Sequence, residues 1–461
     1  MGYRVGLCTL GCKVSQYETE AVAEGFERLG FSVLPFSEVC DVYVINTCTV
    51  TAESDRKSRQ FVRRAIHTNP HAVVMVMGCS AQNDPEAISH IPGVAYVIGT
   101  DHKMTLPAEA LRLLTQKQTD PEQTIVCNSE DNAETPAQTS PEQPHTAECH
   151  VTDLASATFE PMSVKKAPRT RAYVKIEDGC DCRCSYCAIP GARGPVRSRP
   201  TKDVLKEVRC LTAGGTREVV LTGIEIASWG RDLGRRSLID LLEQLDRDCH
   251  GVRFRLGSLT PELLRGDFLP RLAVLPSVVP HLHLSIQSGS DTILHAMRRR
   301  YNTADVLAGM QRMRQLVPRV QFTCDVMVGF PGETDALFRE TVAFLEQARF
   351  MDMHIFVYSP RPGTPAATFP DRVPAEVGHR RSQRLEALRA DIQADIYRAC
   401  VEEAVPIPVL FETCRDGVWF GHGDNYLPVR VTSADDLHAQ LRLVRPLSFD
   451  DDGISGMLTD A

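Results

Sequence analysis

The chain of 461 residues is long enough for two or three domains with separate hydrophobic cores. Its formal net charge of −8 does not exclude a nucleic-acid partner. Residues 118–164 hold nine acidic residues and no Lys or Arg, which leaves 51 basic against 50 acidic residues elsewhere. No apolar run has transmembrane length and no signal peptide is recognisable, so we expect a cytoplasmic protein with no membrane partner. In such a protein, sixteen cysteines indicate metal binding or catalysis rather than disulfides.

Residues 1–117 alternate between strand and helix patterns. Apolar runs predict strands at residues 5–8, 42–45 and 73–76. A helix is expected from Ser15 to Leu29, with Ser15 and Glu18 forming a capping box at its start. This β-α-β-α-β order predicts a parallel α/β domain with helices on both faces of its sheet.

Three cysteines, Cys12, Cys48 and Cys79, stand at or just past the carboxyl ends of those strands. Open α/β sheets bind their ligands at this edge. A single cysteine is more often a small buried hydrophobic residue, but three at equivalent strand ends are hard to explain in that way. We therefore predict that they hold an auxiliary [4Fe–4S] cluster with one iron left open.

Residues 118–168 are rich in Pro, Ser, Thr, Glu and Gln and poor in large apolar residues. This composition predicts an acidic linker or surface insertion that forms no packed core. Cys127 and Cys149 lie inside it and are poor ligand candidates.

The most informative motif is a cysteine loop after the strand-like run Ala172–Ile176. Cys180, Cys184 and Cys187 are spaced C-x3-C-x2-C. Three thiolates on so short a loop can hold three irons of a [4Fe–4S] cluster and leave the fourth open to a chelating ligand. A zinc knuckle is the alternative, and the additional Cys182 is compatible with it. Zinc sites usually pair two hooks of the C-x2-C type, however, and the sequence has no second hook.

Residues 169–403 have the pattern of a second α/β domain. Its expected strands cover residues 172–176, 218–221, 252–256, 281–286, 321–328 and 354–358. Helical stretches separate these six strands and a long charged helix follows them, which predicts a partial (βα)6 barrel with a trailing helix. Chemistry in such barrels is located at the carboxyl ends of the strands.

Residues 404–448 show short alternating strands, which predict a small antiparallel β-barrel. Tyr426 in this domain is a candidate to stack on an RNA base. A structural cap that binds no ligand is the alternative. Residues 449–461 are expected to be a frayed tail.

The cysteine loop, with Tyr186 directly before its third cysteine, resembles the radical S-adenosylmethionine (SAM) superfamily. The following run Ile189–Arg199 makes the chain similar to the methylthiotransferases within that superfamily. Thr9–Glu20 resembles the subfamily that acts on N6-threonylcarbamoyladenosine in tRNA, although Ser15 stands where that subfamily usually has Asn. Gly421–Val429 resembles the closing motif of a TRAM domain, an RNA-binding barrel.

The resemblance implies contacts to SAM from the ends of the barrel strands. The residues expected to make them are Tyr186, Thr222, Gly223, Glu225, Ser258, Gln287, Val328 and Gly329. Contacts to RNA are expected from Arg197 and Arg199, which lie in a local basic cluster, and from Tyr426 of the TRAM-like barrel. No side chain is assigned as the catalytic group.

The implied cofactors are two [4Fe–4S] clusters and SAM, and the implied partners are the anticodon stem-loop of tRNA and an electron donor such as flavodoxin or ferredoxin. The implied reaction adds a methylthio group to C2 of N6-threonylcarbamoyladenosine at position 37, beside the anticodon, with sulfur from the auxiliary cluster. Sulfur insertion in this form requires both cysteine trios to reach one cavity. The alternatives are the same reaction on N6-isopentenyladenosine or on a ribosomal-protein side chain, and an RNA-binding module whose clusters are structural or redox-sensing.

Overall fold

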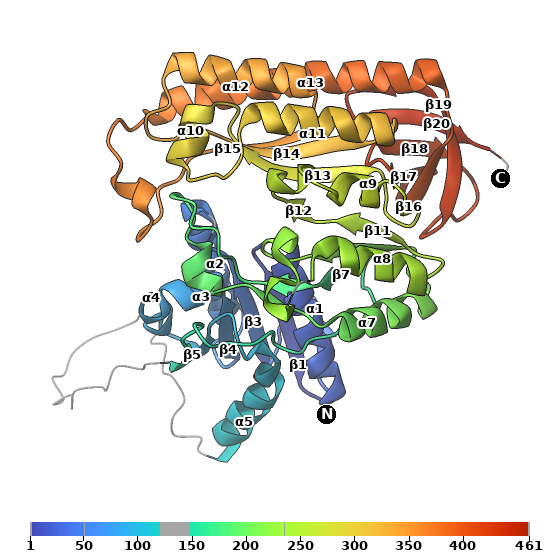
Figure 1. Ribbon diagram of the computed structural model, residues 1–461. Coiled ribbons are helices and arrows are strands. Elements are labelled where there is room, and N and C mark those ends of the chain that lie inside the picture. The colour runs from blue at the N-terminus through green and yellow to red at the C-terminus, as the bar shows by residue number, and fades with distance from the viewer. Residues whose placement is uncertain (1, 50, 120–146, 235, 460–461) are drawn as a thin grey trace. The chain divides into compact units, whose positions relative to one another are not determined.

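The structure, a computed structural model, describes residues 2–49, 51–119, 147–234 and 236–459 (Figure 1). It divides into two compact units, of which unit 1 comprises Met1–Val164 with Ala188–Pro195 and unit 2 comprises Lys165–Cys187 with Val196–Ala461. The short segment Ala188–Pro195 therefore belongs with unit 1, although it directly follows the cysteine loop of unit 2 in the sequence. In the part of the chain that the structure describes, no helix is long and apolar enough to span a membrane.

Unit 1 is built on a six-stranded parallel sheet in the order β2-β1-β3-β4-β5-β6. Its strands are β1 (Arg4–Thr9), β2 (Ser32–Leu34), β3 (Val42–Thr47), β4 (Val73–Gly78), β5 (Val94–Ile98) and β6 (Glu148–His150). Its helices are α1 (Lys13–Arg28), α2 (Ala52–Thr68), α3 (Cys79–Asn83), α4 (Pro85–Ser89), α5 (Leu106–Thr119) and α6 (Ile189–Arg193). Along β3, Val42 and Val44 join one apolar cluster with α1 and α5, whereas Tyr43 and Ile45 join another with α2 and α4. The two-faced parallel domain predicted from the sequence is thus confirmed.

The start of α1 differs from the prediction. The helix begins at Lys13 rather than at Ser15, Cys12 is its N-cap residue, and no capping box forms. The predicted capping carboxylate belongs to Glu18, and its side chain is fully buried against Arg193 and Lys103 instead. Long-range charge pairing has therefore replaced the local hydrogen bond that the sequence pattern indicated.

The expected acidic insertion is shorter than 118–168. The strand β6 pairs with β5 at the edge of the sheet, and the chain as far as Val164 belongs to unit 1. Cys149 lies in this strand and is exposed. Residues 120–146, with Cys127, lie outside the described part of the chain.

Unit 2 contains the expected series of six parallel strands, distributed over two sheets. The third strand of the series is divided into β11 and β12, one in each sheet. The first sheet has the order β11-β10-β7 and the second β12-β13-β14-β15. The strands are β7 (Arg171–Lys175), β10 (Glu218–Thr222), β11 (Arg253–Leu256), β12 (Ser258–Leu259), β13 (His281–Gln287), β14 (Gln321–Val328) and β15 (Asp352–Val357). A short antiparallel pair is formed by β8 (Glu177–Asp178) and β9 (Arg197–Ser198).

Gly257 marks the point at which the third strand of the series passes from one sheet to the other. Residues before it pair with β10 as β11, and residues after it pair with β13 as β12. Its backbone N–H donates to the Leu221 carbonyl at 2.8 Å, and a Cβ at this position would lie 2.9 Å from that oxygen. Glycine permits this close approach, so the divided sheet is still one continuous βα series.

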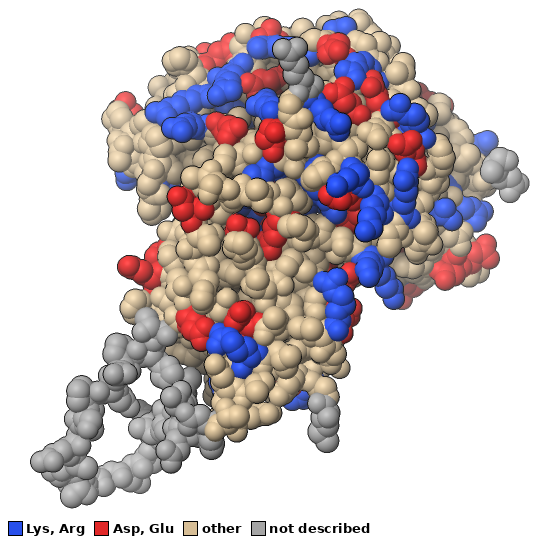
Figure 2. Space-filling view, turned by 60° about the horizontal axis from the view of Figure 1, so that its bottom comes forward, with Lys and Arg blue, Asp and Glu red and all other residues tan. Residues whose placement is uncertain are grey.

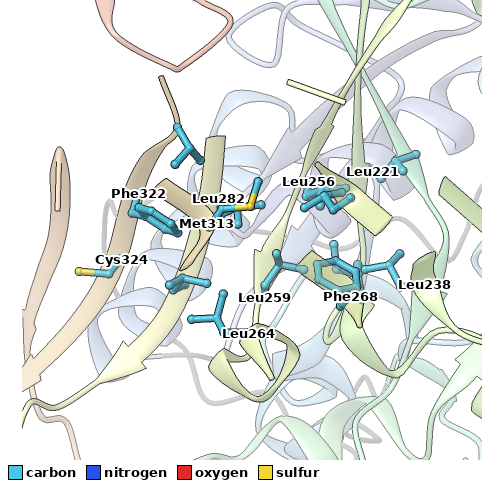
Figure 3. Packing of buried hydrophobic residues seen from close by; sticks show 14 of the residues in the cluster. Leu221, Leu238, Leu256, Leu259, Leu264, Phe268, Leu282, Met313, Phe322 and Cys324 are labelled. Atoms are coloured by element: carbon cyan, nitrogen blue, oxygen red, sulfur yellow. The ribbon is translucent and has the colours of Figure 1, made fainter. Parts of the chain in front are cut away.

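Helices cover the outer face of the unit 2 strands (Figure 1). They are α7 (Thr201–Ala213), α8 (Leu238–Asp248), α9 (Phe268–Leu272), α10 (Asp291–Ala296), α11 (Thr303–Leu316), α12 (Asp335–Ala348) and the trailing α13 (Ala375–Glu403). Short 3-10 helices cover Lys103–Thr105 in unit 1 and Ile226–Ser228, Arg231–Leu233, Pro261–Leu264 and Pro365–Thr368 in unit 2. The core under these helices contains Leu282 and Phe322 from neighbouring strands together with Met313 of α11 (Figure 3). Alternate residues of each strand enter this core, which leaves the other face of the strands for polar side chains.

The C-terminal part of unit 2 is a closed barrel with the strand order β16-β17-β18-β20-β19. Its strands are β16 (Ile407–Arg415), β17 (Val418–Gly423), β18 (Pro428–Thr432), β19 (Leu441–Asp450) and β20 (Gly453–Leu458). The barrel is confirmed, but the expected tail at 449–461 is wrong, because β20 pairs with both β18 and β19 and closes the sheet. Two glycines in a six-residue strand left too weak an apolar alternation for the sequence to indicate it.

Candidate metal centres

Cys12, Cys48 and Cys79 lie at the carboxyl edge of three adjacent strands of unit 1. Cys12 caps α1, Cys48 directly follows β3, and Cys79 is the first residue of α3. Cys48 and Cys79 are buried and Cys12 is exposed. Cys48 and Cys12 both act electrostatically to raise the pKa of Cys79, as expected for thiols at one edge of the sheet.

The Cys79 thiol needs a positive partner in order to ionise. Burial raises its pKa to about 11, and the nearby Arg193 guanidinium opposes this rise. The free thiol therefore keeps its proton at neutral pH. Metal ligands are thiolates, so metal binding at this edge would be coupled to release of that proton.

A fully buried charge cluster surrounds Cys79. Arg193 of α6 donates from Nε to Cys79 Sγ at 3.1 Å, and its two terminal nitrogens donate to Glu18 Oε1 at 2.5 Å and Oε2 at 3.1 Å. Lys103 Nζ donates to the same Glu18 Oε1 at 3.2 Å. The Arg193, Glu18 and Lys103 side chains are each 0% exposed. The bidentate ion pair between Arg193 and Glu18 fixes the orientation of the guanidinium towards Cys79 Sγ.

The second trio lies on the loop that follows β8 in unit 2. Cys184 is buried, whereas Cys180, Cys187 and the additional Cys182 are half-buried. Ser185 anchors the loop, because its backbone N–H donates to Met297 O at 3.1 Å and its hydroxyl donates to Ala296 O at 2.8 Å.

The start of this loop is held by a buried carboxylate. Asp178 Oδ2 accepts from Lys175 Nζ at 2.5 Å and lies 3.4 Å from Arg197, while its Oδ1 accepts from the Gly179 N–H at 2.9 Å. The side chains of Lys175, Asp178 and Arg197 are almost completely buried. The strand pair β8–β9 and this charge cluster therefore set the position from which the cysteine loop starts.

Arg299 contacts the loop trio directly. Its terminal nitrogens donate to Cys184 Sγ at 3.2 Å and to Ser285 O at 3.0 Å, and its Nε donates to the Tyr301 hydroxyl at 3.0 Å. Tyr186, the aromatic residue of the loop motif, is nearby, and burial raises its pKa well above the usual value.

Neither trio shows the geometry of a single-ion site, since no group of three or more His, Cys, Asp or Glu in the described ranges is arranged to hold one metal ion. Three thiolates that each bind a different iron of a cluster do not need that geometry, and the sulfur donor set suits such a cluster.

The residues expected to contact SAM lie at the carboxyl ends of barrel strands, apart from Tyr186 on the cysteine loop and Ser258, which begins the two-residue strand β12. Thr222 ends β10 and Gly223 and Glu225 follow it, Ser258 lies in β12, Gln287 ends β13, Val328 ends β14 and Gly329 follows it. The structure thus brings them to the edge from which the cysteine loop also leaves its strand pair. Their contact with SAM stays a prediction.

Two buried acceptors at this edge have no hydrogen-bond partner among the described residues, Glu177 Oε1 and Gln287 Oε1. The other carboxylate oxygen of Glu177 accepts from the Glu225 N–H at 2.7 Å. Burial raises the pKa of Glu177 well above its usual value. A Cβ on Gly223 would lie 2.6 Å from Glu177 Oε2, so a larger residue here would require this carboxyl group to move.

Arg197 and Arg199 are placed differently from what their proposed RNA contact suggests. They are only 5% and 4% exposed, Arg197 pairs with Asp178, and Arg199 pairs with Glu207 of α7. These ion pairs favour a structural role, and direct RNA contact by either residue stays a prediction.

Tyr426 also has partners within the protein. Its ring stacks against those of His281 and His422, with centroid distances of 4.6 and 5.0 Å, and Arg255 Cζ lies 5.0 Å from its centroid. The ring thus joins the C-terminal barrel to β13 and β11. Base stacking by Tyr426 stays a prediction.

On the face drawn in Figure 2, Lys and Arg side chains lie among Asp and Glu side chains, so charge alone does not outline an RNA-binding surface there.

Comparison with known proteins agrees with this geometry. The model of the radical SAM superfamily matches residues 174–345, and that of the uncharacterized protein family UPF0004 matches residues 4–99. The chain is 36% identical over 448 residues, covering 96% of this chain and 93% of the relative, to the threonylcarbamoyladenosine tRNA methylthiotransferase MtaB of Bacillus subtilis. It is 32% identical over 397 residues, covering 85% of this chain and 84% of the relative, to the tRNA-2-methylthio-N(6)-dimethylallyladenosine synthase of Carboxydothermus hydrogenoformans.

Among solved structures, the radical SAM methyltransferase TsrM from Kitasatospora setae, with cobalamin and a [4Fe–4S] cluster bound, has a TM-score of 0.55 at 16% identity. The match covers 91% of this chain and 81% of TsrM and supports the fold. Fold and cysteine loop together define a radical SAM protein. Within that superfamily, the chain belongs to the threonylcarbamoyladenosine tRNA methylthiotransferase family.

The sequence did not identify Arg193, Glu18, Lys103 or Arg299 as parts of the two sites. Arg193 lies within the motif that follows the cysteine loop, and Arg299 lies in a basic run, so both were visible only as members of charged groups. Glu18 carries a local capping signal that conceals its buried role. The pairing of each arginine with a particular cysteine becomes evident only in three dimensions.

Proposed function

We propose that this protein is a tRNA methylthiotransferase that converts N6-threonylcarbamoyladenosine at position 37, beside the anticodon, into its 2-methylthio form. One SAM supplies the methyl group, a second supplies the 5′-deoxyadenosyl group that takes the hydrogen atom from C2, and sulfur comes from the unit 1 cluster. The C2–H bond is thereby replaced by C2–S–CH3. The observation that carries the proposal is the family relationship over 96% of the chain, together with two separate cysteine trios.

The six cysteines of the two trios are the proposed ligands of two [4Fe–4S] clusters. When bound, the loop cluster supplies the electron that cleaves SAM and the unit 1 cluster supplies sulfur. The chain itself contributes thiolates held at fixed positions. Burial of Cys48 and Cys79 in unit 1 and of Cys184 in unit 2 limits access of water to these proposed ligands.

The proposed SAM site is the carboxyl edge of the unit 2 strands. SAM carries an ammonium group and an adenine amine, both N–H donors. The acceptors Glu177 Oε1 and Gln287 Oε1, buried at this edge without a partner in the described structure, suit such donors. A ligand here would satisfy groups that otherwise cost free energy.

The macromolecular partner in this proposal is the anticodon stem-loop of tRNA, which the C-terminal TRAM-like barrel is suited to contact. Its substrate base lies in a loop, where an unpaired base edge can be reached. The electron comes from a donor such as flavodoxin or ferredoxin. Because tRNA functions in the cytoplasm, the proposal places the protein there.

Mass spectrometry of nucleosides from total tRNA tests the proposal. Cells that lack this protein should contain N6-threonylcarbamoyladenosine without its 2-methylthio form, and the modified nucleoside should return when the gene is restored. Loss of the methylthio form of isopentenyladenosine instead would assign the other tRNA substrate. Unchanged tRNA in both strains would contradict a tRNA methylthiotransferase.

The non-enzymatic alternative is separated by SAM binding. Reduced, reconstituted wild-type protein should bind SAM more tightly than the variant in which Cys180, Cys184 and Cys187 are all Ala. Equal affinities would favour an RNA-binding module whose clusters are structural or redox-sensing. Equilibrium dialysis with labelled SAM under anaerobic conditions measures the difference.

A further inference from the structure

Each cysteine trio has one sulfur that accepts a hydrogen bond from an arginine, which is fully buried in unit 1 and half-buried in unit 2. In unit 1, Arg193 Nε lies 3.1 Å from Cys79 Sγ. In unit 2, an Arg299 terminal nitrogen lies 3.2 Å from Cys184 Sγ. Each guanidinium is also held by further hydrogen bonds, and each donates to one thiol of its trio, which indicates related roles.

Arg193 is held by charge partners. Both of its terminal nitrogens bond to Glu18, and Lys103 lies 3.2 Å from Glu18 and 3.9 Å from Glu160. Among the described residues, two cations thus lie together with two carboxylates of opposite charge. Cys79 therefore receives a directed N–H donor from a guanidinium whose charge is partly offset by Glu18.

Arg299 is held by neutral partners. Its other donors go to the Ser285 carbonyl and the Tyr301 hydroxyl, and in the described part of the chain it forms no ion pair. Its positive charge is therefore not offset by a carboxylate partner. A thiolate-bound cluster beside it would gain a full charge interaction as well as a hydrogen bond.

The origin of Arg193 adds a further point. It is supplied by Ala188–Pro195, the segment that follows Cys187 in the sequence yet belongs to unit 1. In addition to Arg193, the segment is held by the Thr100 hydroxyl, which donates to Ala192 O at 2.7 Å. The unit 1 site is therefore completed by residues that lie outside the matched region 4–99.

We propose that Arg193 and Arg299 are matched positioning residues, each orienting one ligand cysteine and favouring the reduced state of the cluster at its own site. This inference rests on the proposed function, because it takes the two cysteine trios as cluster ligands. Hydrogen bonds to ligand sulfurs and nearby positive charge both raise the reduction potential of iron–sulfur clusters. At Arg193 the paired Glu18 offsets part of the charge that acts on the cluster, whereas Arg299 has no carboxylate partner among the described residues and acts with its charge less offset.

The test uses full-length protein with only one trio intact, so that each cluster is observed separately. The Cys180/Cys184/Cys187→Ala protein isolates the unit 1 site, and the Cys12/Cys48/Cys79→Ala protein isolates the loop site. Into each background we would introduce Arg193→Gln and Arg299→Gln in turn. The readouts are iron per chain after anaerobic reconstitution and the midpoint potential followed by electron paramagnetic resonance during reductive titration.

We expect Arg193→Gln to move the potential of the unit 1 cluster to more negative values and to leave the loop cluster unchanged. Arg299→Gln should move the potential of the loop cluster to more negative values and leave the unit 1 cluster unchanged. The shift at the loop cluster should be the larger of the two. Because Arg193→Gln leaves Glu18 with one cation fewer, the double variant Glu18→Gln/Arg193→Gln restores charge balance with Lys103 and Glu160. It should hold iron as well as its background and still show the negative shift.

Unmoved potentials in clusters that are otherwise intact would overturn the inference and leave the proposed function standing. An equal shift of both clusters by either variant would overturn the inference in the same way. Absence of any iron–sulfur cluster in both single-trio backgrounds and in the wild-type protein would overturn the proposed function itself.

Discussion

The two cysteine trios are assembled in opposite ways. The unit 1 trio is drawn from three separate strand ends, so the register of β1, β3 and β4 brings its thiols together. The unit 2 trio occupies one loop of eight consecutive residues, 180–187, and requires anchors at Asp178 and Ser185 to fix its shape. The first site is thus organised by the sheet before any metal binds, whereas the second is organised by local hydrogen bonds around a loop.

The surroundings of the two sites differ in charge as well. At Cys79 the neighbouring Arg193 pairs with Glu18, whereas at Cys184 the acceptors that the described residues offer to Arg299 are neutral. Under the proposed function, the unit 1 site donates sulfur and the loop site passes an electron, and these two roles require different electrostatics. Arg299, whose positive charge is less offset, lies beside the loop trio, and this is the site proposed to accept an electron.

The largest expected effect comes from removing either trio as a whole. Both the Cys12/Cys48/Cys79→Ala and the Cys180/Cys184/Cys187→Ala proteins should yield no methylthio nucleoside, and each should retain about four of the roughly eight irons of the wild type. Only the first should still produce 5′-deoxyadenosine from SAM. Chromatography of the reaction products with iron analysis checks this, and about four irons in the wild-type protein would contradict the two-site comparison.

Removing the carboxylate of Glu18 should destabilise unit 1 strongly. Glu18→Leu leaves Arg193 and Lys103 buried with one carboxylate fewer, a change that costs about 3–5 kcal/mol in comparable buried pairs. Denaturant unfolding followed by a probe in unit 1 measures the loss. The matched control is Glu27→Ala on the same helix, at an exposed position, where stability should stay within about 0.5 kcal/mol of the wild type. Equal effects of both changes would show that the charge cluster is unimportant.

The corresponding change at the loop is Asp178→Asn. Lys175 and Arg197 would lose the carboxylate that they share, and two buried cations at the start of the cysteine loop would face a neutral amide, whose oxygen can still accept from the Gly179 N–H. We expect loss of iron from the loop site with the unit 1 site unaffected, as judged by iron content in the two single-trio backgrounds. If both sites keep their iron in Asp178→Asn, the loop trio does not depend on the Asp178 charge cluster for its shape.

Gly223→Ala should weaken SAM binding without removing a cluster. The added methyl group would approach Glu177 Oε2 to 2.6 Å and Ile226 Cγ2 to 2.8 Å, so the carboxyl group must move. We expect a loss of about tenfold in SAM affinity, equivalent to about 1.4 kcal/mol, at unchanged iron content. Isothermal titration with SAM measures it, and unchanged affinity would remove this strand end from the proposed SAM site.

The smallest effect is expected at an ordinary ion pair away from both trios. His354 and His283 flank Asp325 on adjacent strands of unit 2 at 3.1 and 3.2 Å. The hydrogen bond to Asp325 raises the pKa of His354, so its contribution is fully present below about pH 6.5 and is lost as the pH rises through the higher folded value. Since His354 is largely exposed, the wild type should lose only a small part of its thermal stability between about pH 6 and pH 8.

His354→Gln should flatten that part of the pH profile. Differential scanning calorimetry at several pH values checks this prediction. A loss of stability in His354→Gln as large as that in Glu18→Leu would show that the buried charge cluster at Cys79 contributes no more than an exposed ion pair. The Asp325 carboxyl, whose pKa is held low by the two histidines against the effect of burial, contributes stability above its unfolded pKa and loses it only in acid.

The sequence predicted the architecture well because strand ends, βα alternation and cysteine spacing are local patterns. The six-strand series and the positions of Cys12, Cys48 and Cys79 at strand ends were visible in this way. The weak strand β20 and the late strand β6 were missed, since short segments with glycine or acidic residues are ordered only by the sheets they join. The buried role of Glu18 was missed because its partner Arg193 is 175 positions away.

The placement of Ala188–Pro195 within unit 1 has a consequence for protein engineering and for the exchange of domains among relatives. A chimera that replaces residues 1–164 alone would pair one protein's Cys79 and Glu18 with another protein's Arg193 segment. A functional exchange therefore has to carry both stretches, even though they are separated along the chain. In the same way, an N-terminal fragment ending near Val164 would present the thiols of Cys12, Cys48 and Cys79 without the arginine that orients one of them.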